Sequence, residues 1–141
     1  MTETDTRIRC RYLSLQGADS LLLSATATAV NAANARSLLT EWAHRHDVPS
    51  ELIADVVYAA YEAIANVVEH AYSGGAGSFT LRADDTPHQL CVTISDTGSW
   101  TPPSPTPGWR GRGIPLIRAL ADSVHIGSDD AGTTVELYWQ K

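Results

Sequence analysis

Apolar residues in the first half of the chain recur with the period of an α-helix. This spacing predicts a helix over residues 30–46, in which four apolar positions share one face: Ala35, Leu38, Leu39 and Trp42. It predicts a second, clearer helix over residues 51–72, with Ser50 as its N-cap. On this helix the apolar side lies opposite a polar side centred on Glu62. We therefore expect two amphipathic helices that each bury one face.

The second half of the chain alternates apolar and polar residues with the period of a β-strand. In the best example, Leu90, Val92 and Ile94 point to one face of a strand over residues 89–96. The pattern, with a short apolar run near the start, predicts five strands, at residues 21–28, 78–82, 89–96, 123–127 and 133–139. A short third helix is predicted over residues 114–122. Such alternation is typical of an antiparallel sheet with one covered face.

Length and composition fit one folded domain. The 141 residues are 43% hydrophobic, which provides enough apolar material for a single core. We expect the domain to span residues 20–141, with residues 1–19 as an N-terminal extension or edge strand. The longest nearly apolar stretch, residues 54–68, contains Asp55, Glu62 and Asn66, so we expect no membrane span. The N-terminus lacks the apolar core of a signal peptide, which predicts a cytoplasmic protein.

Charge and cysteine content exclude several classes of partner. Ten Lys and Arg against 16 Asp and Glu give a net charge of −6, which disfavours nonspecific binding to nucleic acid or to an anionic membrane. The two cysteines, Cys10 and Cys91, are far apart and match no paired spacing. We therefore expect neither a disulfide framework nor a zinc site.

Residues 97–112 form a long connection rich in glycine and proline, with no periodicity of its own. Loops of this length inside one domain are uncommon and are usually functional or disordered. No acidic residue occurs from residue 97 to residue 121, whereas Arg110, Arg112 and Arg118 are positive. In an acidic chain this local reversal predicts an anionic ligand. Two glycines just before the third helix would offer it free backbone N–H groups.

Three other segments carry candidate chemistry. Glu62, Asn66 and His70 recur every four residues along the second helix. Alone, such a stripe is typical of the solvated side of an amphipathic helix, but a carboxylate beside an amide oxygen also suits a base next to a Mg²⁺ ligand. Asp96, with Gly98 after it, ends a strand, where it is either a turn residue or an acceptor for a ligand amino group. Thr133 and Thr134 begin a strand and are uninformative alone.

In this order, the segments resemble the motifs of the GHKL (Bergerat-fold) ATP-binding family. Glu62–Asn66, followed by His70-Ala71-Tyr72, is similar to the N box of that family, and three later segments are similar to its G boxes: Asp96–Gly98, Gly111–Ile117 and Gly132–Thr134. The resemblance implies an α+β fold, a two-layer sandwich with a mixed, mainly antiparallel sheet and three helices on one face. Within the family, the short chain and the string Gly-Arg-Gly-Ile-Pro-Leu-Ile look like the anti-sigma-factor serine/threonine kinases.

The resemblance also implies ATP and Mg²⁺ as cofactors and gives each matching residue a role. Glu62 would be the general base, Asn66 would hold the Mg²⁺ that bridges the phosphates, and Asp96 would bind the adenine amino group. Gly98 would form the turn beneath the base, and Thr133 or Thr134 would assist Asp96. The remaining matching residues would meet the phosphates: Arg110, Gly111, Arg112, Gly113 and Ile114.

The function implied is that of a protein serine/threonine kinase and anti-sigma factor. Such a protein would bind a sigma factor and phosphorylate a STAS-domain anti-anti-sigma partner, as a homodimer that contacts neither nucleic acid nor membrane. Two alternatives stay open from the residues: a nucleotide-dependent binding module that sequesters a partner without catalysis, and a small metabolic phosphotransferase. The intact pair of Glu62 and Asn66 favours an enzyme.

Overall fold

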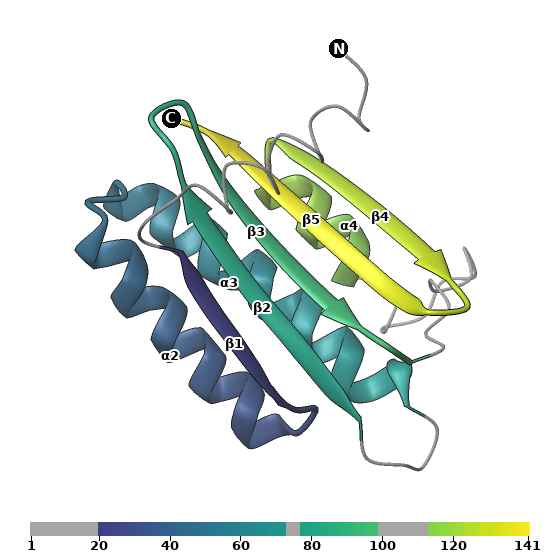
Figure 1. Ribbon diagram of the computed structural model, residues 1–141. Coiled ribbons are helices and arrows are strands. Elements are labelled where there is room, and N and C mark those ends of the chain that lie inside the picture. The colour runs from purple at the N-terminus through teal and green to yellow at the C-terminus, as the bar shows by residue number, and fades with distance from the viewer. Residues whose placement is uncertain (1–19, 73–76, 99–112) are drawn as a thin grey trace.

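In the computed structural model, which describes residues 20–72, 77–98 and 113–141, five strands form one sheet (Figure 1). The strands are β1 (Leu21–Thr26), β2 (Ser78–Asp85), β3 (Gln89–Asp96), β4 (Ser123–Asp129) and β5 (Gly132–Gln140). Their order across the sheet is β1-β2-β3-β5-β4, and each neighbouring pair is antiparallel. The sheet expected to be mixed is thus antiparallel throughout these residues.

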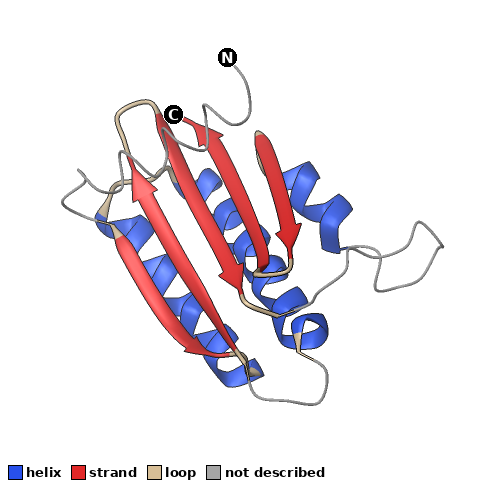
Figure 2. Ribbon diagram, turned by 45° about the vertical axis from the view of Figure 1, so that its right-hand side comes forward, coloured by secondary structure: helices blue, strands red, loops and turns tan. Residues whose placement is uncertain are grey.

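The helices all lie against the same face of this sheet (Figures 1 and 2). They are α2 (Ala29–Arg45), α3 (Ser50–Asn66) and α4 (Gly113–Leu120), and α3 continues directly into a single π-helical turn, η1 (Val67–Ala71). The predicted α+β two-layer sandwich with three helices on one face is therefore confirmed. The N-terminal extension, including a strand considered for residues 7–15, lies outside the described residues.

Packing against the sheet decides which helical residues are buried. On α2, Ala35, Leu39 and Trp42 are buried as predicted, but Leu38 is 40% exposed. The expectation for Leu38 is wrong because the stripe that contacts the core is narrower than the apolar pattern. The N-cap of α3 is Pro49, with no side-chain cap, so Ser50 is the first helical residue and not the cap that we expected.

The core lies between α3 and the central strands β3 and β5, whose helix-facing residues are paired in register. Val92 pairs with Leu137, and Leu90 with Trp139, and all four side chains are fully buried or nearly so. The Trp139 indole N–H donates to the Leu120 carbonyl at 2.8 Å. This bond ties the end of α4 to β5, so the short third helix is held in place by the central sheet.

The last turn of the second helix departs from the regular α-helix that the sequence predicts over residues 51–72. A π turn contains an extra residue, so it changes the direction in which the following side chains point. Asn66, the last residue before this turn, is only 8% exposed although the helical pattern places it on the polar side. A polar side chain is thus buried directly before the π turn, at the end of the helix that carries the motif.

Cys91 is not a free thiol, since it forms a disulfide. The expectation that the chain forms no disulfide is wrong. Cys10, the other cysteine of the sequence, lies outside the described residues.

Across residues 20–72, 77–98 and 113–141, the helices are all too short or too polar to span a lipid bilayer.

Candidate functional site

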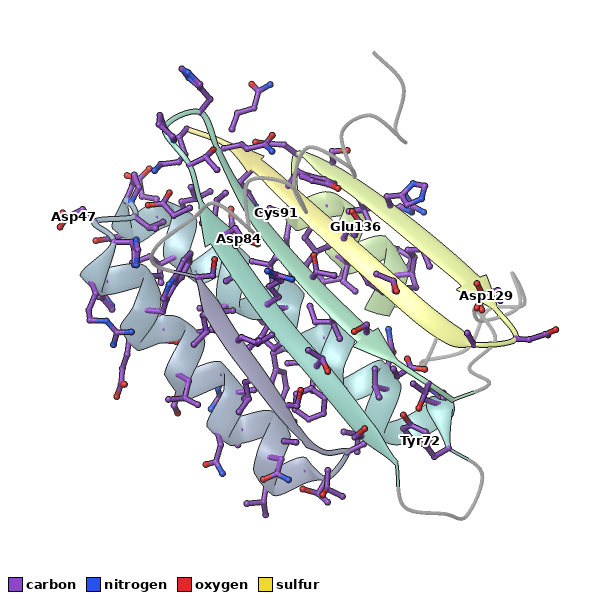
Figure 3. The ribbon with its side chains drawn as sticks, in the orientation of Figure 1. Asp47, Tyr72, Asp84, Cys91, Asp129 and Glu136 are labelled. Carbon is purple, nitrogen blue, oxygen red and sulfur yellow. The ribbon has the colours of Figure 1, made fainter. Side chains whose placement is uncertain are left out.

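Several of the segments singled out in the sequence lie at one end of the sheet, where η1, the end of β3 and the start of β5 meet (Figure 1). Tyr72, directly after η1, lies at this end (Figure 3). β3 and β5 are antiparallel neighbours, so the last residue of one strand pairs with the beginning of the other. Asp96 pairs with Thr133 and Ser95 with Thr134. Two motifs that are 36 residues apart are therefore adjacent because of the sheet register.

Asp96 is a buried carboxylate held by backbone hydrogen bonds. Its side chain is 8% exposed, and the Gly98 N–H donates to its Oδ1 at 2.9 Å. Burial raises the pKa of Asp96, although hydrogen bonds from the backbone of Gly98 and of Thr133 act to lower it. A carboxylate fixed in this way, with part of its hydrogen-bonding capacity still available, is suited to accept a hydrogen bond from a ligand amino group.

Glycine is required at two positions around Asp96, because at each of them another backbone segment lies too close to leave room for a Cβ atom. A Cβ at Gly98 would lie 2.1 Å from the Ala71 carbonyl oxygen, at the end of η1. Gly132 has φ of +137°, and a Cβ there would lie 1.9 Å from the Asp96 carbonyl oxygen. The turn that follows Asp96 is thus packed between the helix end on one side and the start of β5 on the other.

Tyr72 connects the helix to the same turn by hydrogen bonds. Its hydroxyl donates to the Ser78 carbonyl and accepts from the Thr97 N–H at 3.2 Å. Tyr72 therefore joins the end of η1, the start of β2 and the turn after Asp96. Together with the contact between Ala71 and Gly98, it fixes the helix that carries Glu62 and Asn66 relative to Asp96.

Asn66 has a nearly buried side chain whose carboxamide has no hydrogen-bond partner in the described part of the chain. The polar atoms of this carboxamide remain open to solvent, so the group is available as a ligand to a cation or to a polar ligand. Residues 20–72, 77–98 and 113–141 contain no cluster of three His, Cys, Asp or Glu residues that would hold a metal ion. A Mg²⁺ ion at Asn66 would therefore need most of its oxygen ligands from a bound phosphate compound and water.

Glu62 lies one helical turn before Asn66 and is partly buried. Burial raises its pKa, and the negative charge of Glu69 raises it further. A raised pKa makes a carboxylate a better proton acceptor, as general-base catalysis requires. The Nε2 atom of His70, the third residue of the stripe, lies 3.6 Å from a carboxylate oxygen of Glu69, and the two form an ion pair when the imidazole is protonated.

Thr133 and Thr134 lie on opposite faces of β5. Thr133 is buried on the face of Asp96, and its hydroxyl lies 3.1 Å from that of Ser128. Thr134 belongs to the other face, but it lines, together with Asp96, a cavity of about 360 Å³ at the end of the sheet. Thr133 is the better placed of the two to support the Asp96 carboxylate, while Thr134 borders the same end of the site.

The residues expected to contact phosphates are described only in part. Gly113 and Ile114 are the first two residues of α4, which begins one residue earlier than predicted, and Ile114 packs against the core. Arg110, Gly111 and Arg112 lie outside the described residues.

Two other buried carboxylates have structural roles. Asp84 and Glu136 lie on the sheet face opposite the helices (Figure 3). Asp84 accepts a hydrogen bond from the Ser20 hydroxyl, and Glu136 accepts one from the Tyr138 hydroxyl. Both belong to the packing of that face and not to the site at the sheet end.

Three residues that organise the site have no candidate role in the sequence analysis: Ala71, Tyr72 and Gly132. All three stand in quoted motifs, since Ala71 and Tyr72 follow His70, and Gly132 precedes Thr133. Their roles depend on contacts between segments that are 25 or more residues apart, such as the bond from Thr97 to Tyr72. The sequence shows only that these three residues neighbour motif residues. It does not show which distant residues they contact.

We expect Tyr72→Phe to lower the free energy of unfolding by about 0.5–1.5 kcal/mol, because the Thr97 N–H and the Ser78 carbonyl lose a partner. Tyr61→Phe is the matched control, since no hydrogen bond involves its hydroxyl in the described chain. Urea denaturation of both variants measures the difference. Equal stability of the two variants would show that the Tyr72 hydroxyl does not hold the turn.

Comparison with known proteins agrees with this geometry. Residues 24–139 match the family described as histidine kinase-like ATPase domain. A solved structure of the RsbU and RsbW domains of Rv1364c from Mycobacterium tuberculosis superimposes with a TM-score of 0.69 at 26% sequence identity. That match covers 85% of this chain and 32% of the mycobacterial chain, so this chain spans about a third of its relative. The chain belongs to the histidine kinase-like ATPase domain family.

Proposed function

We propose that this chain is an ATP-dependent protein serine/threonine kinase that acts as an anti-sigma factor. The observation that carries the proposal is the packing of Gly98 against Ala71, which holds Asp96 in a fixed position relative to the helix of Glu62 and Asn66. A nucleotide-binding carboxylate, a cation ligand and a proton acceptor are then supported by one rigid junction. Phosphoryl transfer depends mainly on such positioning and on charge neutralisation.

In this proposal Glu62 is the general base. Its carboxylate accepts the proton of a serine or threonine hydroxyl on the acceptor protein. The hydroxyl oxygen forms a bond to the γ-phosphorus as the bond from that phosphorus to the bridging oxygen breaks, and ADP leaves. The raised pKa of Glu62 supports this role, because it increases the proton affinity of the ionised carboxylate.

Asn66 and Asp96 bind the nucleotide at its two ends. Asp96 accepts a hydrogen bond from the adenine amino group, with Thr133 beside it in the register and Gly98 below. Asn66 would hold Mg²⁺ through its carboxamide oxygen, and the metal would supply positive charge to neutralise the phosphates. Arg110, Gly111, Arg112, Gly113 and Ile114 complete the site on the phosphate side.

The regulatory role rests on the similarity to a chain that contains an RsbW domain. We propose that the physiological partners are a sigma factor and a STAS-domain anti-anti-sigma protein, that the latter is the phosphorylated substrate, and that the protein acts in the cytoplasm as a homodimer. A nucleotide-dependent binding module would share the fold and the nucleotide site but would not need a proton acceptor at Glu62.

The proposal is tested by Glu62→Gln. The variant should keep the increase in thermal stability that Mg-ATP gives the wild-type protein, because Glu62 does not bind the nucleotide. Transfer of labelled phosphate to a STAS-domain protein should fall by about 10²-fold or more, since the amide cannot accept the proton. Transfer at the wild-type rate would remove Glu62 from the mechanism, and absence of transfer by the wild-type protein would favour the binding module.

The Asp96→Asn variant tests separately how Asp96 affects the stability of the free protein and how it affects nucleotide binding. The pKa of Asp96 is raised in the folded state, so the folded protein binds more protons than the unfolded chain between the two pKa values, and stability falls as pH rises through this window. Asparagine does not ionise. Without nucleotide, we therefore expect the variant to be at least as stable as the wild type at pH 7.

With bound nucleotide, the wild-type protein should be more stable than the Asp96→Asn variant. At a concentration of 100 times its Kd, Mg-ADP should stabilise the wild-type protein by about 2.7 kcal/mol and the Asp96→Asn variant by much less. Thermal unfolding with and without Mg-ADP measures both effects. Asp130→Asn is the control, because it removes the same charge from the exposed turn between β4 and β5. An equal nucleotide effect in all three proteins would contradict the role of Asp96.

Glu69→Gln should change the pH dependence of transfer. The Glu69 charge raises the pKa of Glu62, so its removal should lower that pKa. The general base must be ionised, hence the acidic limb of the pH–rate profile should move to lower pH. Glu51→Gln is the matched control, since Glu51 lies on the same helix about 16 Å away along the axis. A profile that is unchanged in Glu69→Gln, or changed equally in both variants, would mean that Glu62 does not set this limb.

A further inference from the structure

The sheet face opposite the helices carries a patch of four buried side chains, Asp84, Cys91, Glu136 and Tyr138, which we call the Cys91 patch (Figure 3). Asp84 and Tyr138 are the partners of Cys91 on the two neighbouring strands, so the three residues form a row across the sheet. Cys91 is 1% and Tyr138 is 6% exposed. A tyrosine on an uncovered sheet face would be largely open to water, so this part of the face is covered.

The helices of the described chain do not provide this cover. α2, α3 and α4 all lie against the other face of the sheet (Figures 1 and 2). Farther along the same open face, Thr93 and Ser95 are partly exposed, and Leu22 is 65% exposed. The cover is therefore confined to the Cys91 patch, and it comes from a part of the chain outside the described residues.

The disulfide of Cys91 identifies the covering segment. Cys10 is the only other cysteine of the chain, so it is the partner of Cys91. The chain also reaches this face at the right place, because the Ser20 hydroxyl donates to Asp84, which is paired with Cys91 in the register. Cys91 lies two strands from β1, which is about 10 Å. The segment of residues 11–19 can span up to about 30 Å, so it is long enough to join Ser20 to Cys10 over Cys91.

The sequence around Cys10 suits a segment that lies on a sheet. Apolar residues and arginines alternate there, in the order Arg7, Ile8, Arg9, Cys10, Arg11 and Tyr12. Successive residues of an extended chain point to opposite sides. The side that contains Cys10 would then face Tyr138 with its apolar neighbours, and the arginines would face water.

We propose that residues 1–19 lie across the Cys91 patch as a strap, that a disulfide between Cys10 and Cys91 fixes it, and that reduction releases it. A dithiol reductant forms its own disulfide as the bond between the two cysteine sulfurs breaks. Two electrons and two protons pass from the dithiol to these sulfurs, which become thiols. In the cytoplasm, where we propose that the protein acts, disulfides are usually transient and catalytic or redox-sensing. The oxidation state of the protein would decide whether this face is covered, with or without the proposed kinase activity.

Limited digestion with trypsin tests the strap, since Arg7, Arg9 and Arg11 are cleavage sites within it. We expect cleavage at these sites to become about tenfold faster or more when dithiothreitol reduces the oxidised wild-type protein, because the released segment is open to the protease. The Cys10→Ser variant is the control: it has no disulfide to break, so cleavage should be fast with and without dithiothreitol. Cleavage after Arg36, inside α2, should stay far slower than cleavage of the strap in every sample, which separates release of the strap from unfolding.

Mass spectrometry of a digest made without reductant, together with a non-reducing gel, locates the disulfide. The strap requires that Cys10 is joined to Cys91 within a monomer. Free thiols after treatment with an excess of diamide, or a disulfide-linked dimer, would overturn it. Equal cleavage rates in the oxidised and reduced wild-type protein would also overturn it, and slow cleavage of Cys10→Ser would show that the segment stays in place without the bond.

Discussion

The close contact between Gly98 and the Ala71 carbonyl is the constraint on which the site depends. The Glu62 and Asn66 side chains belong to a helix, and Asp96 belongs to a strand, so their separation is set by the packing of one element on the other. A backbone-to-backbone contact of this kind permits little relative movement, because neither partner has a flexible side chain at the point of contact. The hydrogen bonds of Tyr72 reinforce the same junction from the side.

The site keeps polar groups in places where burial is unfavourable. Asp96 is ionisable and buried, and Asn66 presents a carboxamide without a hydrogen-bond partner in the described chain. Burial of the Asp96 carboxylate costs stability in the free protein, and a ligand that donates a further hydrogen bond to it offsets this cost. Asp84 and Glu136 provide a useful contrast, because neighbouring hydroxyl groups already donate to those buried carboxylates.

The two layers of the sandwich make different contributions to the proposed chemistry. The sheet brings Asp96 next to Thr133 because β3 and β5 are paired, although the two motifs are far apart in the sequence. The helical layer contributes Glu62 from α3.

The sequence by itself determined the strands, the two long helices and the motif residues, because period and residue type are local properties of the chain. The strand over residues 89–96 is a clear case, since its apolar alternation coincides with β3. Only the tertiary structure decided that Leu38 is exposed, that Asn66 is buried before a π turn, and that Gly98 packs on Ala71. Each of these depends on which distant segment covers a residue, and that information is absent from the spacing of residues along one element.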